Sequence, residues 1–559
     1  MDVASFLEQC GIGITSGGFL GLIAVGYTLV YGTVGLIHFA HGDVVMLGGC
    51  LSLAILSFLV PIPVDPLTGC LVVVLAAMCS GLFCGCLNVC IDQFVYRPLR
   101  NAPPLSPLVS TIGVSFVLMN VGLIWIGPTD RAFPEIFLES TRSVGGMAIA
   151  MADLLVLVII VPPVFCLYVL LRQTRFGRSL RSIAAITRVT ARSGEAGKLV
   201  IATFFLSGFL GGVASVAAGV HATTINYQMG HQMGLYALTA AVLGGIGSVP
   251  GAIVGGLIVG LIRAISVALS WPSLGYCIGL SCAHHFSCIS PARNFWEIKD
   301  KRRAAMKIQF ASLFHLMKWS KKKWEIPVFT ILALAPWFHP AFAGGLGGQI
   351  TSVLIIGIAA LGLNVMVGFT GLLHLGIASF FGLGGLFLAV LTVPMNPLEI
   401  GFLPAVLVSV SVTAAIGTLL GSPTLRLRGE YLAIVTLGFG EVVRALFLNL
   451  ENVTGGPQGL GPIPPPGSGI FVAGIDLGRE FVVDSRWFYY LSLTVLFVVV
   501  LLVRILEKSA LGRAWIAVRE EPLAAATIGI SATKVRLSAF TIAAGIAGLA
   551  GCLSVASIG

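Results

Sequence analysis

Charged residues are scarce in this sequence. Only 10% of its 559 residues are Asp, Glu, Lys or Arg, while 57% are hydrophobic and the mean hydropathy is +0.99. One soluble core cannot hold so much apolar surface, so the composition excludes an ordinary soluble globular protein. It predicts instead a polytopic membrane protein, for which the bilayer serves as the solvent.

The sequence also lacks the motifs of common enzyme classes. Its one Gly-Lys pair, Gly197-Lys198, is followed by Leu199 and has no preceding glycine at the spacing of an ATP-binding P-loop. Neither an HExxH zinc helix nor a GxSxG nucleophile elbow occurs. We therefore expect no catalytic residue, no bound ATP or other cofactor, and no enzyme activity in this chain.

A metal site is not expected either. Cysteine and histidine gather between Cys277 and Cys288, but their spacing matches none of the usual paired-ligand patterns of zinc sites. Most of the other cysteines lie in apolar runs, where buried free thiols are expected. Basic residues are not interleaved with aromatic residues in a patch, which argues against nucleic acid as a partner.

The sequence contains an internal repeat. Residues 26–49 return without gaps at 362–385, and eight of the 24 positions are identical, including the His38/His374 pair. We infer that two related membrane halves lie in one polypeptide. Two further motif pairs follow in the same order: TIGVSF at Thr111 with TLGFGE at Thr436, and GRSLRSI at Gly177 with GRAWIAV at Gly512.

Long apolar runs locate the membrane spans. Residues 234–289 are interrupted by GGIGSVPG and by Trp271-Pro272, so three short spans, or a re-entrant segment with one span, both fit. The prediction is an all-α membrane protein with eight or nine spans in the first half and seven in the second. The other spans are expected at 14–37, 42–60, 68–90, 107–126, 150–171 and 199–220, and then at 326–343, 350–370, 374–393, 401–422, 431–448, 487–506 and 534–556.

The distribution of Lys and Arg predicts the orientation in the membrane. Residues 281–325 hold ten basic and three acidic residues and separate a first half (1–280) from a second half (326–559). We expect this linker to be cytoplasmic, either as a solvated tether or as a basic amphipathic helix on the membrane. The span at 326–343 then returns the chain to the outside, so that both repeats start on the same face and run parallel.

A pair of cytoplasmic loops is the clearest candidate for a binding surface. Each loop starts with Gly-Arg and ends with Ala-x-x-Gly, a recurrence that positive charge alone does not explain. A short amphipathic helix in such a loop would dock a soluble partner. The candidate residues are Gly177, Arg178, Arg181, Ala191 and Gly194 in the first loop, and Gly512, Arg513, Glu520, Glu521, Ala525, Ala526 and Gly529 in the second.

Polar residues within the apolar spans are the second set of candidates. Burying such groups in a membrane costs free energy unless they face a cavity or a partner, so they would line a translocation pathway. The competing interpretation is that they hydrogen-bond neighbouring helices together. The candidates are Tyr27, Thr28, His38, His41, Asp43, Asn120, Asn364 and His374.

The motifs together resemble one family of transporters. The first half, with GLIHFAHGD, YRPLR at Tyr96 and VLGGIGSVPGAIVGG at Val242, is similar to the LivH-type permeases of branched-chain amino acid ABC importers. The second half, with GLNVMVGFTGLLHLG, LRLRGEYLAIVTLGFGEVVR and LGRAWIAVREEPLAAATIGI, is similar to their LivM-type partners. The resemblance covers most of the chain.

The resemblance implies a fused permease in the bacterial plasma (inner) membrane that conducts a small-molecule substrate. It also implies two separate ABC ATPase subunits, which use the ATP and dock at the paired loops. An external or periplasmic substrate-binding protein would deliver the substrate.

Three alternatives stay open. The same family includes urea and short-chain amide importers, and no residue here separates those substrates from branched-chain amino acids. A secondary transporter or channel would need no ATPase. A membrane-embedded enzyme would use His38, His41 and Asp43, although these have no recognisable nucleophile or metal partner nearby.

The second half is expected to be incomplete. After its docking loop the first half continues through residues 244–260, and nothing in the second half matches that stretch. Each polar group left unpaired in lipid costs on the order of several kcal/mol. We therefore expect a closed pathway to need a further C-terminal segment.

Overall fold

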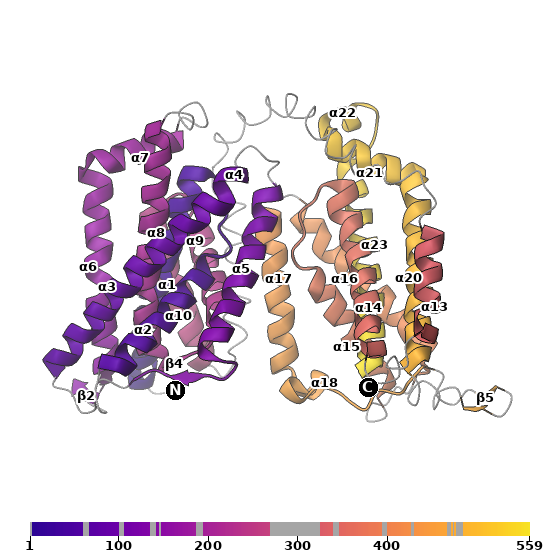
Figure 1. The fold of residues 1–559 in the computed structure, drawn as a ribbon, viewed down its shortest axis with the longest axis horizontal. Helices are drawn as coiled ribbons and strands as arrows, with labels where there is room; N and C mark the ends of the chain where they lie inside the picture. The colour runs from indigo at the N-terminus through magenta and orange to yellow at the C-terminus, as the bar shows by residue number, and fades with distance from the viewer. Residues whose placement is uncertain are drawn as a thin grey trace. The chain divides into compact units, whose positions relative to one another are not determined.

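The computed structural model consists of two compact units, Met1–Ser290 (unit 1) and Pro291–Gly559 (unit 2), whose boundary falls inside the predicted linker. Figure 1 shows both units as bundles of helices. Residues 281–324 of the linker, the Cys277–Cys288 cluster and Ala191 lie outside the described residues. The structure describes residues 3–59, 66–99, 105–134, 141–144, 147–185, 194–268, 325–338, 346–393, 400–425, 430–466, 471–472, 475–476 and 485–558.

Unit 1 is built almost entirely of helices. Two short antiparallel strand pairs, β1 (Arg131–Ala132) with β4 (Thr224–Ile225) and β2 (Thr141–Val144) with β3 (Met147–Ala150), connect helix ends. The helices are α1 (Val3–Val34), α2 (His41–Leu59), α3 (Pro66–Ile91) with the π-helical turn η1 (Asp92–Tyr96) and α4 (Arg97–Leu99), α5 (Leu105–Ile126), α6 (Met151–Gln173), α7 (Arg175–Ala185), α8 (Gly194–Ala222), α9 (Met229–Leu243) and α10 (Val249–Ala268).

Unit 2 follows a similar order. It has one short strand pair, β5 (Phe471–Val472) with β6 (Ile475–Asp476). Its helices are α13 (Glu325–Phe338), α14 (Leu346–Asn364) with the π-helical turn η7 (Val365–Phe369), α15 (Ile377–Thr392), α16 (Phe402–Thr424), α17 (Glu430–Asn449), α18 (Glu451–Thr454) with the 3-10 turn η8 (Gly456–Gln458), α20 (Ser485–Lys508), α21 (Ala510–Glu520), α22 (Pro522–Thr527) and α23 (Ala532–Ile558).

The helices have the length and composition of membrane spans. Within the described residues, eleven are long and apolar enough to cross a bilayer, seven in unit 1 and four in unit 2, which confirms the all-α membrane prediction. The seven spans expected in the second half correspond to these four and to three weaker helices. Of the three, α13 has 14 residues, α15 has 16, and the 20-residue α17 carries Glu430, Glu441 and Arg444.

Residues 234–289, which the sequence allows to form either three short spans or a re-entrant segment with one span, are described in part. The 15-residue α9 and the 20-residue α10 are joined by a turn in which Gly245 and Gly247 have φ of 87° and 103°. These left-handed values favour glycine and explain the GGIGSVPG sequence. Residues 269–289, on which a third span depends, lie outside the described residues.

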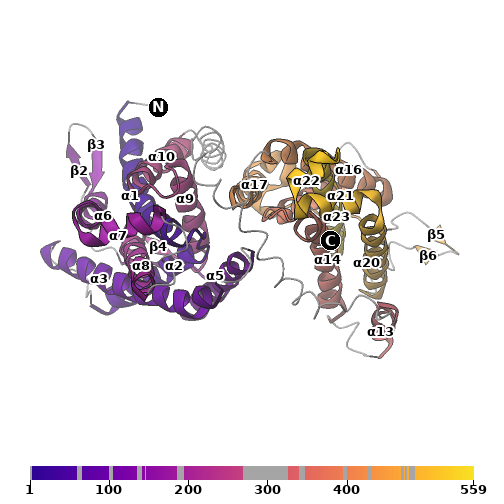
Figure 2. The same cartoon turned by 90° about the horizontal axis from the view of Figure 1, so that it is seen from above.

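The internal repeat is visible in the backbone. In unit 1, α8 packs against α1, α2 and α3, and in unit 2, α23 packs against α14, α15 and α16 (Figure 2). The first helix of each repeat stops at a glycine of left-handed conformation, with φ of 71° at Gly35 and 68° at Gly371. A short non-helical segment then leads to α2 or α15. The sequence repeat therefore corresponds to two copies of one helical arrangement.

Glycine lets neighbouring helices approach closely. A methyl group on Gly260 would overlap the backbone of Gly17 in α1, and one on Gly212 would overlap the carbonyl oxygen of Ser80 in α3. Small residues at such crossings are typical of membrane helix packing. The structure thus supports a packing role for these glycines.

The two units differ after the helix that closes the repeat. In unit 1, α8 is followed by α9 and α10, and α10 covers Gly17 of α1. In unit 2, α23 is the last described helix. Val353, at the α14 position that corresponds to Gly17, is 66% exposed. Among the described residues, this position of α14 is therefore uncovered, whereas its counterpart in α1 is packed against α10.

Candidate functional site

The Gly-Arg start of each predicted docking loop is a sharp helix junction. The N–H of Gly177 donates to the hydroxyl of Thr174 over 3.4 Å, between α6 and α7. In unit 2, the N–H of Gly512 donates to the hydroxyl of Ser509 over 3.2 Å, between α20 and α21. Here Ser509 acts as the N-cap of α21. The same capping geometry recurs in both units.

The glycines at these junctions have no room for a side chain. A methyl group on Gly177 would overlap the carbonyl oxygen of Leu171, and one on Gly512 would overlap that of Leu506. The overlap arises because the chain folds back from the long helix into the short one. Steric fit thus explains why Gly recurs at both positions.

The loop in unit 2 presents a small surface of mixed character. Leu523 and Ile528, at the two ends of α22, are 75% and 73% exposed, while Ala525 between them is buried. The turn that follows contains Gly529 with φ of 84°. Sequence analysis missed Leu523 and Ile528, because the three alanines between them and the nearby Ile530 leave no clear contrast between apolar and polar positions in this loop. Of the predicted residues, Arg513, Glu520, Glu521, Ala526 and Gly529 are exposed.

The corresponding loop in unit 1 is described only in part. Gly177 is buried, Arg178 is exposed, and the backbone of Arg181 belongs to α7. Gly194 begins α8, and residues 186–193, including Ala191, lie outside the described residues. In Figure 1, α7 lies at the end of unit 1 opposite β2 and the N-terminus.

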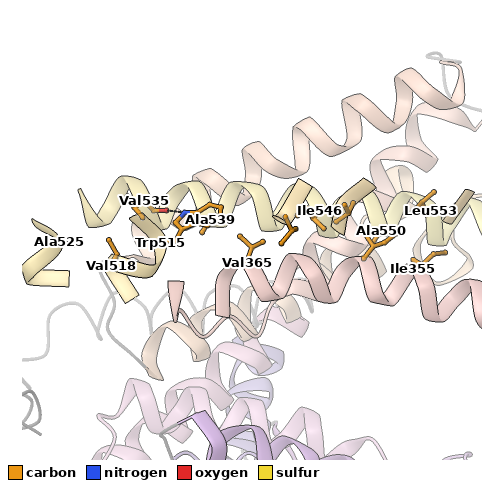
Figure 3. Close-up of a cluster of buried hydrophobic side chains, with 13 residues drawn as sticks. Ile355, Val365, Trp515, Val518, Ala525, Val535, Ala539, Ile546, Ala550 and Leu553 are labelled. Atoms are coloured by element: carbon orange, nitrogen blue, oxygen red, sulfur yellow. Dashed lines mark hydrogen bonds between the residues drawn. The ribbon is translucent and has the colours of Figure 1, made fainter. Parts of the chain in front are cut away.

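The buried side of α21 joins it to the rest of unit 2. Trp515 is fully buried and its indole N–H donates to the carbonyl oxygen of Val535 and to the hydroxyl of Ser538, both over 3.0 Å. Its ring stacks on Phe369 of η7 with the ring centroids 6.1 Å apart. Figure 3 shows Trp515 within a cluster that also includes Val365 of η7. Helix α21 is therefore packed against the end of the first repeat helix.

A polar cluster occupies the interior of unit 1. The Nε2 atom of His38 lies 2.7 Å from Oδ1 of Asn88, and its Nδ1 lies 2.6 Å from the hydroxyl of Tyr96. The amide of Asn88 also donates to the carbonyl oxygen of Phe204 in α8 over 3.0 Å. Because Oδ1 only accepts, Nε2 donates and Nδ1 accepts from Tyr96, so the partners suit a neutral imidazole.

His41 lies beside this cluster. It is fully buried, with its ring centroid 4.9 Å from that of Tyr27 and 5.9 Å from that of His38. A methyl group on Gly26 would overlap the His41 ring, so Gly26 provides the space for it. The structure thus brings together Tyr27, His38 and His41 in the interior of unit 1.

Two further predicted residues in unit 1 have unsatisfied polar atoms. Asp43 accepts a hydrogen bond from Ser115, while its second oxygen, Oδ1, has no partner among the described residues. The hydroxyl of the buried Thr28 also has none in that part of the chain. An unpaired buried polar group costs free energy, which makes these atoms candidates for contact with a transported molecule.

The matching position in unit 2 has a different environment. His374 is buried, with its ring centroid 5.6 Å from that of Phe380 and 5.1 Å from that of Phe540. The next residue, Leu375, donates its N–H to the hydroxyl of Thr436 over 3.0 Å. The two histidines therefore share a place in the repeat but not a set of partners.

The two predicted asparagines do not join these clusters. Asn120 is exposed on α5 and its amide donates to the carbonyl oxygen of Phe116 in its own helix over 2.7 Å. Asn364 is exposed at the end of α14. Conversely, sequence analysis missed Asn88, Tyr96 and Ser115. Tyr96 alone had a signal, since it begins the YRPLR motif.

These features define a polytopic helical membrane protein of two tandem repeats, each with a polar interior position and a short helix at one end. The chain belongs to the family described as branched-chain amino acid transport system / permease component, whose profile matches residues 11–280 and 346–559. This match confirms the family resemblance, and the family is one of transport permeases rather than enzymes. No solved structure matches the chain.

Known permeases are similar to parts of the chain. All three relatives below are named high-affinity branched-chain amino acid transport system permease proteins. LivM of Salmonella typhimurium is 41% identical over 227 residues, which cover 37% of this chain and 52% of LivM. LivH of Escherichia coli K12 is 35% identical over 227 residues, which cover 40% of this chain and 73% of LivH. BraD of Pseudomonas aeruginosa is 34% identical over 230 residues, which cover 40% of this chain and 74% of BraD. The chain spans 52–59% of the length of the LivM relatives that it matches.

Proposed function

We propose that this chain is the membrane permease of an ATP-driven importer of the ABC class, in the bacterial plasma (inner) membrane. The observation that carries the proposal is the twofold match of the permease family, at residues 11–280 and 346–559. In the proposed complex this one chain takes the place of two separate permease subunits. The names of the related permeases favour branched-chain amino acids, or other small amino acids, as the substrate.

The proposed complex contains two kinds of partner. Two ABC ATPase subunits hold and hydrolyse the ATP, so the permease itself needs no cofactor. One ATPase docks on α21 and α22, where Leu523 and Ile528 offer apolar contact beside the charges of Glu520 and Glu521. The other docks on α7 and the loop that follows it in unit 1. An external substrate-binding protein delivers the substrate to the opposite face.

The proposed pathway in unit 1 passes the polar cluster of Tyr27, His38 and His41. Thr28 and Asp43 are the best candidates for direct contact, since each has a buried oxygen with no partner among the described residues. A hydroxyl and a carboxylate can both accept hydrogen bonds from the ammonium group of an amino acid. Asn120 and Asn364 are exposed and lie outside this cluster, so we do not propose that they contact the substrate.

Reconstitution into vesicles tests the proposal. The chain is incorporated with the two ATPases and the binding protein, and uptake of radiolabelled leucine, isoleucine, valine, urea and acetamide is measured with and without ATP. We expect uptake of the branched-chain amino acids that disappears when the P-loop lysines of the ATPases are replaced. Uptake by the chain alone on an ion gradient would refute the ABC mechanism, and uptake restricted to urea or acetamide would refute the substrate assignment.

A further inference from the structure

The first helix of the unit 2 repeat ends in an unusual way. After Asn364, α14 widens into the π-helical turn η7, and the chain leaves the helix at Gly371 with φ of 68°. The N–H of Leu372 still reaches back to the carbonyl oxygen of Met366 over 3.3 Å. Residues 371–376, which contain His374, then lead to α15. Short π-turns of this kind are frequent at functional positions.

Arg519 of the docking helix α21 contacts this helix break twice. Its guanidinium donates to the carbonyl oxygen of Gly368, in the last turn of η7. Its aliphatic stem covers Gly371, where a methyl group would lie 2.8 Å from Cγ of Arg519. One side chain therefore holds both the end of the π-turn and the first residue after it.

The backbone that carries Arg519 is itself well fixed. Trp515, one turn earlier in α21, stacks on Phe369 of η7 and is anchored by hydrogen bonds to α23. Arg519 also forms an ion pair with Glu520, with 3.0 Å between the guanidinium nitrogen and the carboxylate oxygen. Only Glu521 separates α21, which carries Arg519 and Glu520, from the start of α22 at Pro522.

Among the described residues of unit 1, this connection has no counterpart. When the Gly177 and Gly512 motifs are aligned, Arg519 corresponds to Ala184, which has no side-chain donor. The first helix of unit 1 also ends without a π-turn, at Gly35, whose N–H donates to the carbonyl oxygen of Tyr31 over 2.8 Å. A methyl group on Gly35 would meet nothing within 4 Å. In the part of the chain that the structure describes, a contact of this kind therefore occurs at Gly371 and not at Gly35.

We infer that Arg519 is a positioning residue that links the partner surface at α22 to the helix break at 365–376, and that only unit 2 transmits partner movement in this way. The inference rests on the proposed function, because it takes the partner at α22 to be an ABC ATPase. Binding or hydrolysis of ATP in that partner moves α22, and Arg519 passes the movement to the segment that holds His374.

Hydrogen–deuterium exchange of the complete complex tests the inference. Exchange of residues 365–376 is compared with and without ATP, and residues 34–40 of unit 1 serve as an internal reference. Wild-type protein should show an ATP-dependent change at 365–376 that exceeds the change at 34–40. Arg519→Ala should reduce that change about tenfold, as expected when a charged hydrogen bond is lost, while ATPase recovery stays normal. The number of substrate molecules transported per ATP hydrolysed should also fall in this variant.

Two further variants make the result specific. Arg519→Lys keeps the stem and the charge and should restore part of the ATP-dependent change. Lys534→Ala removes an exposed basic side chain at the start of α23 and should behave as wild type. Normal ATPase recovery with an undiminished change at 365–376 in Arg519→Ala would overturn this inference alone. Failure of the wild-type chain to recover any ATPase would instead overturn the proposed function.

Discussion

At the residue scale, the polar cluster around His38 and the junction glycines show how single side chains decide local structure. Asn88 hydrogen-bonds both the His38 ring and the carbonyl oxygen of Phe204, so one amide connects α3, α8 and the segment between α1 and α2. Gly512 permits the fold-back between α20 and α21. Both residues can be tested against a matched residue of the same type elsewhere in the chain.

Replacement of Asn88 by leucine should destabilise the protein. The change leaves a buried ring nitrogen of His38 without its partner Asn88, which costs about 1–3 kcal/mol, and it removes the additional hydrogen bond to the carbonyl oxygen of Phe204. The measurement is the midpoint of thermal unfolding in detergent. Asn120→Leu is the control, because Asn120 is exposed and bonds only within α5 among the described residues. Equal midpoints for the two variants would contradict the role given to Asn88.

Replacement of Gly512 by valine should prevent the normal junction between α20 and α21. The new side chain overlaps the carbonyl oxygen of Leu506, and overpacking of this kind costs about 1–3 kcal/mol or more. We expect a lower unfolding midpoint and loss of bound ATPase. Gly113→Val, in the middle of α5 with open space around its Cα, should keep the ATPase. A fully stable Gly512→Val protein would show that the junction can bend elsewhere.

At the scale of the element, the short helix α22 is the part of unit 2 best suited to a soluble partner. It lies outside the packed bundle, as Figure 1 shows, and it exposes Leu523 and Ile528. The opposite side of α22 packs against the bundle, because Ala525 belongs to the buried cluster that contains Trp515. An exposed apolar pair on a well-anchored helix is a suitable contact for an ATPase.

Leu523→Asp combined with Ile528→Asp should abolish recovery of the ATPase that docks on unit 2. Truncated apolar anchors at the centre of an interface commonly cost about 2 kcal/mol or more each. Affinity purification of the chain, followed by quantification of bound ATPase, provides the measurement. Thr533→Asp adds the same charge at the start of α23, where an acidic group suits the helix dipole, and should leave binding intact. If the double variant still bound the ATPase, the docking surface would have to lie elsewhere on the chain.

At the scale of the whole molecule, the sequence predicts a defined orientation in the membrane. The basic residues concentrate in segments expected on the cytoplasmic side, including the linker and both docking loops. Within unit 2, α21 and α22 lie at the end of the bundle opposite α18 (Figure 1). This separation within one unit is what a membrane-spanning arrangement with a cytoplasmic docking end requires.

Cysteine accessibility in intact cells measures this orientation. A cysteine introduced at Gln458 should react with a membrane-impermeant reagent added outside the cells. A cysteine introduced at Ser179 should react only after the membrane has been permeabilised. Both positions are exposed in the structure, so burial alone does not protect them. The unaltered chain gives the background from its own twelve cysteines. External labelling at Ser179 would overturn the predicted topology.

Short-range features of the fold could be predicted from the sequence. The Gly177/Gly512 pair marked the start of each candidate loop, because both glycines meet the same local steric requirement. The spans were placed well where apolar runs are long. They were placed less well at α1, expected at 14–37 and found at Val3–Val34, because the polar Glu8 and Gln9 interrupt the apolar run at its start.

The sequence by itself determined the membrane class, the internal repeat and the permease family, because hydropathy and repeated motifs are local properties of the chain. Tertiary structure decided which polar groups meet. Asn88 lies 50 residues from His38, and Arg519 lies 151 residues from Gly368, yet each pair is hydrogen-bonded. Such contacts depend on how helices pack across the bundle, and apolar periodicity fixes only which segments become helices.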